Sequence, residues 1–171
     1  MPKYRIERVT FDHIPWVRLL YSRLVAEERA SYPIIDEAEL DQFVITLARM
    51  IPQPQFWCSV AVIGRKVVGF LAGELYERPV GRPHKVCNPY WLYVTPKHRH
   101  KGVTRQLIAA GVEWLTAQQV EAVELSEAWG RQQQWERRGF HPYLVRYTVS
   151  VPELRTLGAA HASAPVDPPD E

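Results

Sequence analysis

In the first third of the chain, apolar residues recur first at the spacing of a strand and then at the spacing of helices. Residues 4–9 alternate apolar and polar side chains, which predicts a short strand. Asp12 can then cap a helix whose first turn tolerates Pro15. The apolar stripe predicted for this helix consists of Leu19, Leu20, Leu24 and Val25. A second helix is predicted from near Asp36 to a point before Pro52, with apolar positions at Leu40, Phe43, Val44, Leu47 and Met50.

Two strand-like runs follow, with a short turn between them. Residues 56–63 and 67–76 are rich in β-branched and aromatic side chains. The glycine-led turn at residues 64–66 gives them the spacing of a β-hairpin. Residues 77–89 are rich in proline, and we predict that they form a loop.

The stretch from Tyr90 to Leu107 predicts a strand, a basic turn and a helix. Its β-branched and aromatic run stops at Pro96, and apolar residues at helical spacing resume after Gly102. A glycine where a strand gives way to a helix lets the backbone approach a ligand, and the first N–H groups of the helix are unpaired. The turn therefore predicts a phosphate or pyrophosphate site, with a merely solvated basic turn as the alternative. Its basic residues are Lys97, His98, Arg99, His100, Lys101 and Arg105.

The remaining residues predict three more elements and a tail. Residues 122–128 are typical of a strand, 131–138 of a short helix and 143–151 of a last strand. The order of elements is therefore β-α-α-β-β-β-α-β-α-β. We expect one domain over residues 1–151 and a flexible, acidic, Pro/Ala-rich C-terminal tail over residues 152–171.

Composition narrows the class of protein. The chain has 171 residues, 46% of them hydrophobic and 23% charged, which is ordinary for a soluble globular domain. No apolar run reaches the ~20 residues of a membrane span, and the N-terminus lacks the apolar core of a signal peptide, so we expect a cytoplasmic protein. Cys58 and Cys87 are predicted to be buried free thiols, and no metal site is expected. A net charge of +2 gives no reason to expect nucleic-acid or membrane binding.

The spacing Arg99-x-x-Gly102-x-Thr104, preceded by a Val-Thr-Pro run, resembles the acetyl-CoA signature of the GNAT superfamily of N-acetyltransferases. The family has glycine or alanine where Thr104 stands. The resemblance implies that this loop wraps the pyrophosphate of coenzyme A. It also implies an α/β (α+β) fold with a mixed central sheet of about six to seven strands flanked by about four helices. The cofactor-binding residues that it implies are Leu92, Tyr93, Val94, Arg99, His100, Lys101, Gly102, Val103, Thr104, Arg105 and Trp135.

A second patch with the same resemblance lies at residues 135–140, which read WERRGF. The family commonly has Tyr-Glu-Lys-x-Gly-Phe here, beside the pantetheine arm. Trp135 replaces the tyrosine that often protonates the leaving thiolate, and an indole N–H has no accessible acid chemistry. The asparagine common ahead of this helix is also missing. Because a thiol has an intrinsic pKa near ~8.5, a water or a backbone donor can serve instead.

Catalysis by direct attack needs a base and a donor for the thioester oxygen. Among the carboxylates, Glu124 best matches the position of a family base, although plain solubility is the alternative for a strand glutamate. Glu74 and Glu77 are reserve candidates that would bind a cationic acceptor. In the family, a bulge in the strand before the loop frees a backbone N–H for the oxygen, which by position belongs to Leu92, Tyr93 or Val94.

These features predict an acetyl-CoA-dependent N-acetyltransferase that acts on a primary amine of a small molecule or a protein. We also expect a homodimer, and we expect neither nucleic acid nor a membrane as a partner. The alternative is a non-catalytic acyl-CoA-binding module, which the loss of the tyrosine at Trp135 motivates. A nucleic-acid-binding domain is disfavoured because the basic residues are confined to one turn.

Overall fold

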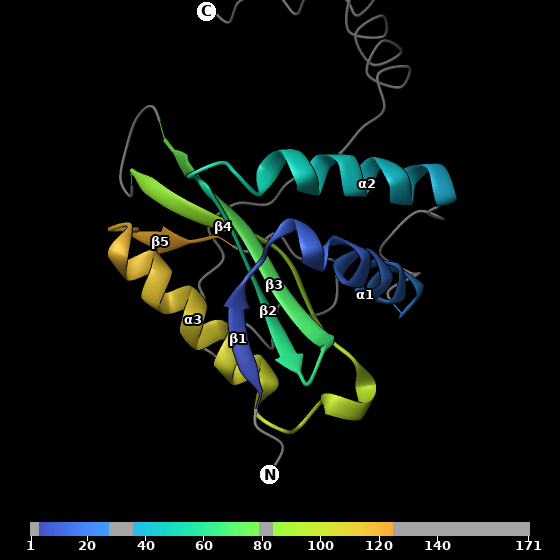
Figure 1. Ribbon diagram of the computed structural model, residues 1–171. Coiled ribbons are helices and arrows are strands. Elements are labelled where there is room, and N and C mark those ends of the chain that lie inside the picture. Colours follow the sequence, from blue (N-terminus) through green and yellow to red (C-terminus); the bar gives the residue numbers. More distant parts are fainter. Residues whose placement is uncertain (1–3, 28–35, 79–83, 125–171) are drawn as a thin grey trace, which may run out of the picture. The chain divides into compact units, whose positions relative to one another are not determined.

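Figure 1 shows the computed structural model, which describes residues 4–27, 36–78 and 84–124. All of these residues belong to one compact unit, Met1–Ala128, and a second unit, Trp129–Glu171, lies outside them. The described strands are β1 (Arg5–Arg8), β2 (Phe56–Ile63), β3 (Lys66–Glu77), β4 (Lys85–Val94) and β5 (Ala122–Val123). The helices are α1 (Ile14–Glu27), α2 (Glu37–Met50) and α3 (Val103–Ala117), with 3-10 helices at Phe11–His13 and Pro96–His98.

The five described strands form one mixed sheet in the order β1-β2-β3-β4-β5. Neighbouring strands are antiparallel, except that β5 runs parallel to β4. The sheet and its helices confirm the predicted α/β fold class. The predicted helix at 131–138, the predicted strand at 143–151 and the predicted tail lie outside the described residues.

Helices cover both faces of the sheet (Figure 1). On one face, α1 and α2 pack against β2 and β3 around Leu20, Leu47 and Phe70. On the other face, α3 packs through Val103 and Leu107. The strand β2 is buried along nearly its whole length because both of its faces meet helices. Within the described part of the chain, no helix has the length and apolar character of a membrane span.

The two N-terminal helices follow the predictions with two corrections. Asp36 caps α2 as predicted: it accepts a hydrogen bond from the N–H of Glu39, whose side chain accepts one from the N–H of Asp36. Asp12 does not cap α1, since it lies inside the 3-10 helix that precedes α1, and Thr10 is the N-cap of that 3-10 helix. Leu19 is 42% exposed, because the buried stripe of α1 instead includes Val17.

The predicted loop at residues 77–89 is wrong at its C-terminal end, because β4 already begins at Lys85. The pairing of β4 with β3 shifts between Ala72, opposite Trp91, and Gly73, opposite Pro89, so Tyr90 is the extra residue of a bulge. A bulge accommodates Pro89 inside a strand, since proline has no N–H to give to the ladder. The bulge therefore lies just before residues 92–94, where the resemblance implied a free backbone N–H for the thioester oxygen.

Both cysteines are buried and free, as predicted. Burial raises the pKa of the Cys58 thiol to about 12 and that of the Cys87 thiol to about 11. Since the thiolate is the nucleophilic form, neither cysteine is poised for covalent chemistry at neutral pH.

Candidate functional site

The loop from β4 to α3 (residues 95–102, the β4–α3 loop) has an unusual backbone. His100 has a φ of 57° and Gly102 a φ of 79°, and both values lie in the left-handed region. Glycine adopts this region without the penalty that other residues meet, which explains its place at the cap of α3. A Cβ atom built on Gly102 would meet only the side chain of Gln106, at 3.9 Å. The protein therefore leaves open space against this stretch of backbone.

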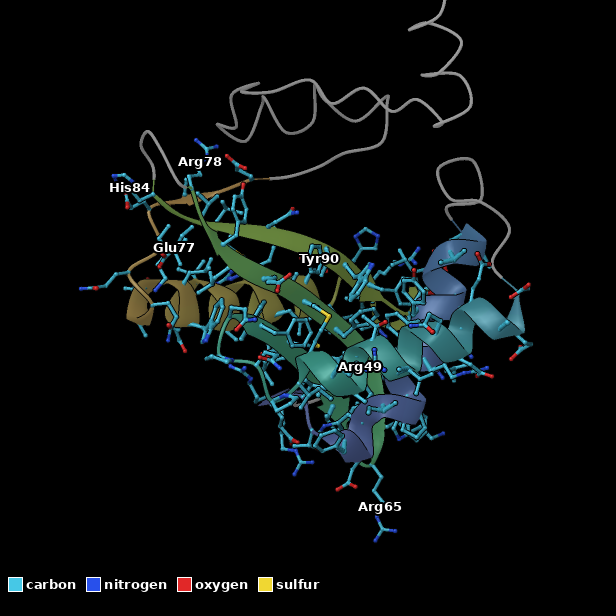
Figure 2. The ribbon with its side chains drawn as sticks, turned by 90° about the horizontal axis from the view of Figure 1, so that it is seen from above. Arg49, Arg65, Glu77, Arg78, His84 and Tyr90 are labelled. Carbon is cyan, nitrogen blue, oxygen red and sulfur yellow. The ribbon has the colours of Figure 1, made fainter. Side chains whose placement is uncertain are left out.

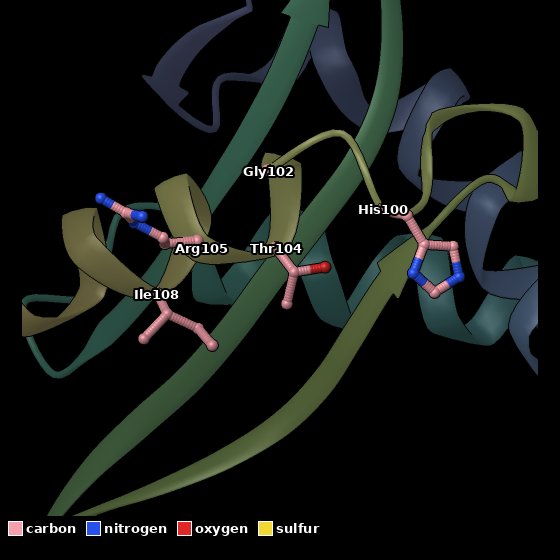
Figure 3. Close-up of a pocket in the computed structure, with 5 residues that line it drawn as sticks. All are labelled: His100, Gly102, Thr104, Arg105 and Ile108. Carbon is pink, nitrogen blue, oxygen red and sulfur yellow. The ribbon is translucent and has the colours of Figure 1, made fainter.

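A pocket of about 440 Å³ lies at the start of α3 and is lined by His100, Gly102, Thr104, Arg105 and Ile108 (Figure 3). The first turn of a helix carries N–H groups without partners in the helix and the positive end of its dipole. Arg105 adds a cation to the same pocket, and Lys101 is exposed in the adjoining loop. Val103 is 1% exposed, so its side chain belongs to the core and only its backbone remains for a ligand. This end of α3 is built to receive an anion.

The side chain of Arg99 has its partners on α1 and β4. Its Nη2 atom pairs with the Glu27 carboxylate at the end of the described α1, and its Nε atom donates to the carbonyl of Val94 at 2.8 Å. The hydroxyl of Tyr93 donates to the other Glu27 oxygen at 2.6 Å. Hydrogen bonds from Tyr93 and Arg99 lower the pKa of Glu27, while burial and Glu27 raise the pKa of Tyr93 to about 12. These three residues form the Glu27 cluster.

His98 also has a partner, because its Nδ1 atom lies 3.0 Å from the hydroxyl of Tyr4. Their rings meet edge to face. Burial and the charges of Lys101 and Lys97 lower the pKa of His98, which favours the neutral ring. This histidine holds the loop against the start of the sheet.

The end of β4 offers backbone N–H groups on its far edge. Thr95 donates its N–H to Val68 on β3 at 2.9 Å, and residues alternate along a strand. The N–H groups of Leu92 and Val94 therefore point away from β3, whereas that of Tyr93 points toward it. Within the described residues, β5 pairs with β4 only at Val86 and Cys87. Side chains at this edge differ in exposure: Leu92 is 37% exposed, and Val94 is 5% exposed.

A group of polar side chains lies at the opposite end of β3, β4 and β5, and we name it the polar cluster. Its members are Glu74, Tyr76, Arg78, Asn88, Tyr90 and Glu124. Alternation along β3 places Glu74 and Tyr76 on the same face as Ala72, which packs in the core under α1 and α2. Glu74 is directly opposite Asn88, and the N–H of Glu124 donates to the carbonyl of Cys87 at 2.8 Å. Asn88 therefore has a glutamate on each neighbouring strand.

Both glutamates of the polar cluster accept hydrogen bonds from phenols. Tyr90 donates to Glu74, and Tyr76 donates to Glu124, whose other oxygen pairs with Arg78. Figure 2 shows Tyr90 on β4 and Arg78 at the end of β3. Burial, and then Glu74, raise the pKa of Tyr90 far above that of a free phenol. Each glutamate of the cluster is therefore hydrogen-bonded to a phenol.

The Oδ1 atom of Asn88 is buried and has no hydrogen-bond partner among the residues that the structure describes. Buried polar atoms are nearly always paired, so an exception calls for a ligand or a water to supply the missing donor. This acceptor oxygen lies between strands that carry carboxylates, which are acceptors as well. The polar cluster is therefore suited to a donor-rich cation such as an ammonium group.

The predicted residues thus fall into separate places. Gly102, Thr104, Arg105 and His100 line the pocket, whereas Arg99 and Tyr93 face Glu27. Glu124 joins the reserve candidate Glu74 in the polar cluster, while Glu77 is exposed at the end of β3. Trp135 lies outside the described residues. Sequence reasoning missed Glu27, Asn88 and Tyr90, and of these only the Pro89 that precedes Tyr90 gave a local signal, since proline inside a strand often marks a bulge.

Comparisons with known proteins show the family to which the chain belongs. The model of the acetyltransferase (GNAT) family matches residues 17–141. The chain therefore belongs to the acetyltransferase (GNAT) family, whose acyl donor is acetyl-CoA. The predicted resemblance, the fold class and the co-substrate of the family are confirmed. No curated protein matches the chain.

Solved structures share the fold at low sequence identity. A predicted acetyltransferase with acetyl-CoA from Clostridium acetobutylicum is 12% identical over 88% of this chain and 98% of its own, with a TM-score of 0.74. An aminoglycoside acetyltransferase from an uncultured soil metagenomic sample, in complex with sisomicin, is 20% identical over 86% of this chain and 96% of its own, with a TM-score of 0.64. AAC(6')-Iy in complex with the bisubstrate analogue CoA-S-monomethyl-acetylneamine is 17% identical over 86% and 99%, with a TM-score of 0.65.

Proposed function

We propose that this protein is an acetyl-CoA-dependent N-acetyltransferase that transfers the acetyl group to a primary amine by direct attack. The observation that carries the proposal is the pairing of two complementary sites on one sheet. The start of α3 offers N–H donors and cations to an anion. The polar cluster offers to a cation its carboxylates and the Asn88 oxygen, which has no partner within residues 4–27, 36–78 and 84–124. A phosphate-bearing acyl donor and an amine acceptor match these two sites.

Acetyl-CoA would be held first by the backbone of the β4–α3 loop. The N–H groups of Val103, Thr104 and Arg105 would donate to the pyrophosphate, with the side chains of Arg105 and Lys101 adding charge. The empty space against Gly102 fits this role, since a side chain there would fill the cradle. His100 would line the same pocket. Trp135, which lies outside the described residues, would pack beside the pantetheine arm, as the resemblance implies.

The edge of β4 that faces away from β3 would hold the thioester carbonyl. An N–H aimed at the oxygen on which charge develops lowers the barrier to attack. Leu92 and Val94 are the two candidates for this donor, because their N–H groups point away from β3. Thiolate departure needs no strong acid, since a thiol has an intrinsic pKa near ~8.5.

The amine would bind at the polar cluster and lose its proton there. A protonated amine cannot attack, so a nearby base must take the proton. We propose Glu124 for this step, either directly or through a water. Glu124 pairs with Arg78 and accepts a hydrogen bond from Tyr76, and these contacts fix the position of its carboxylate. Glu74 and the Asn88 oxygen would hold the ammonium in place before the proton is removed.

A screen of amine acceptors tests this function. The purified protein is incubated with acetyl-CoA and each amine, beginning with aminoglycosides because a structural neighbour is described as an aminoglycoside acetyltransferase. Free CoA thiol and the mass of each amine are measured. We expect acceptor-dependent release of CoA together with an acetylated amine. Tight binding of acetyl-CoA without release for any amine would support the non-catalytic module instead. A cytoplasmic location and a homodimer stay predictions.

A further inference from the structure

We propose that Glu27 is a positioning residue for the β4–α3 loop: it holds Arg99 against Tyr93 and so fixes the backbone that receives the phosphates of acetyl-CoA. The inference rests on the proposed function, since it takes acetyl-CoA binding at this loop as given. It assigns Arg99 a different role from that of a phosphate ligand, although the motif spacing places Arg99 among the cofactor-binding residues.

The geometry ties Arg99 down at several points. Its Nη2 atom pairs with Glu27, its Nε atom donates to the Val94 carbonyl at 2.8 Å, and its guanidinium carbon lies 5.5 Å from the ring centre of Tyr93. Tyr93 is 3% exposed, so it is a fixed platform rather than a mobile surface side chain. Glu27 bridges the two by accepting from the Tyr93 hydroxyl at 2.6 Å with its other oxygen. One carboxylate from α1 thereby orders a residue in the middle of the loop.

The loop needs such an anchor because its backbone is costly. His100, the residue after Arg99, has a φ of 57°, which residues other than glycine seldom adopt. Such a conformation persists only when its surroundings impose it. The Glu27 cluster fixes the chain on one side of His100, and the Gly102 cap of α3 fixes it on the other. Without Glu27, the loop can relax, and the backbone N–H groups at the start of α3 no longer point together at the phosphates.

The charges distinguish this role from direct phosphate binding. If Arg99 bound the pyrophosphate, Glu27 would compete for the same guanidinium, and its removal would strengthen acetyl-CoA binding. If Glu27 positions the loop, its removal weakens binding even though a negative charge has been taken away. The two models therefore predict opposite signs for one neutral substitution, Glu27→Gln.

The test is a double-mutant cycle read by calorimetric titration with acetyl-CoA. We expect Glu27→Gln and Arg99→Gln each to raise the Kd about tenfold, and the double variant to bind no more weakly than either single variant, because both remove one shared unit. Arg99→Lys keeps the charge but loses the contact with Val94, so it should be weakened like Arg99→Gln. In steady-state assays, the KM for acetyl-CoA should rise while kcat and the acceptor KM stay unchanged.

Matched controls separate positioning from general stability. Glu37→Gln breaks the ion pair between Glu37 of α2 and Arg18 of α1 and should leave the Kd unchanged. Arg105→Gln removes a pocket cation, and its effect should add to that of Glu27→Gln. An unchanged or lower Kd for Glu27→Gln would overturn the inference and leave the proposed function standing. Absence of acetyl-CoA binding by the unaltered protein would overturn both.

Discussion

The β4–α3 loop and the polar cluster are built in opposite ways. The loop presents backbone: two residues in the left-handed region and the open first turn of α3, all within a few consecutive positions. The polar cluster presents side chains from three strands, and its Tyr76 and Glu124 are 48 residues apart in the sequence. The loop can receive any ligand with the right phosphates, since main-chain N–H groups distinguish little else. The cluster depends on the identity of each side chain, so we expect acceptor specificity to reside there.

The largest effect expected is on the loop. Gly102→Glu would place a side chain and a negative charge in the cradle, and we expect acetyl-CoA binding to fall by more than about a hundredfold. Gly64 provides a matched control, because it also has a positive φ (59°) and nothing within 4 Å of its Cβ position. Gly64→Glu should cost a similar ~1 kcal/mol of backbone strain but leave binding intact. If calorimetry shows that the two variants bind acetyl-CoA equally well, the loop is only a turn and not a phosphate site.

The next effect concerns Glu124 in the polar cluster. Glu124→Gln should lower turnover about a hundredfold at neutral pH and much less at high pH, where free amine is already abundant. The measurement is kcat against pH for the variant, for the unaltered protein and for Glu113→Gln, an exposed glutamate on α3 that serves as control. An equal loss at every pH would assign Glu124 to acceptor binding or to structure.

A smaller effect is expected for Glu74. Glu74→Gln keeps the shape but removes the charge that would hold the ammonium, so the acceptor KM should rise about tenfold while the Kd of acetyl-CoA is unchanged. Glu77→Gln, on the same strand but exposed, should change neither value. A loss of acetyl-CoA affinity in Glu74→Gln would mean that the two regions do not act separately.

The sequence predicted the loop far better than the cluster, for a physical reason. Strand, turn and helix around Gly102 are local patterns, and Asp36 likewise caps α2 through a partner three residues away. The polar cluster and the Glu27 cluster depend on contacts between distant residues, such as Glu27 with Arg99, which no local period encodes. The start of β4 was missed because the prolines of residues 77–89 favoured a loop. Pro89 nevertheless fits inside β4, beside the bulge.

The smallest effect expected is the slow reaction of the two cysteine thiols with a thiol reagent. Burial raises the pKa values of Cys58 and Cys87 to about 12 and about 11, so the thiolate that reacts is scarce below those values. With Ellman's reagent at pH 8, the folded protein should react slowly, and the denatured protein should show its two thiols promptly. Fast reaction of Cys87 in the folded protein would mean that β4 opens beside Asn88.

The transfer of label from acetyl-CoA to the acceptor tests the central claim most directly. With acetyl-CoA carrying ¹³C at the carbonyl, we expect one labelled amide on the amine for each CoA released, seen by NMR and by mass. Label that appears only as acetate, or that stays on CoA while acetyl-CoA binds tightly, would contradict the claim that the two sites cooperate in N-acetyl transfer.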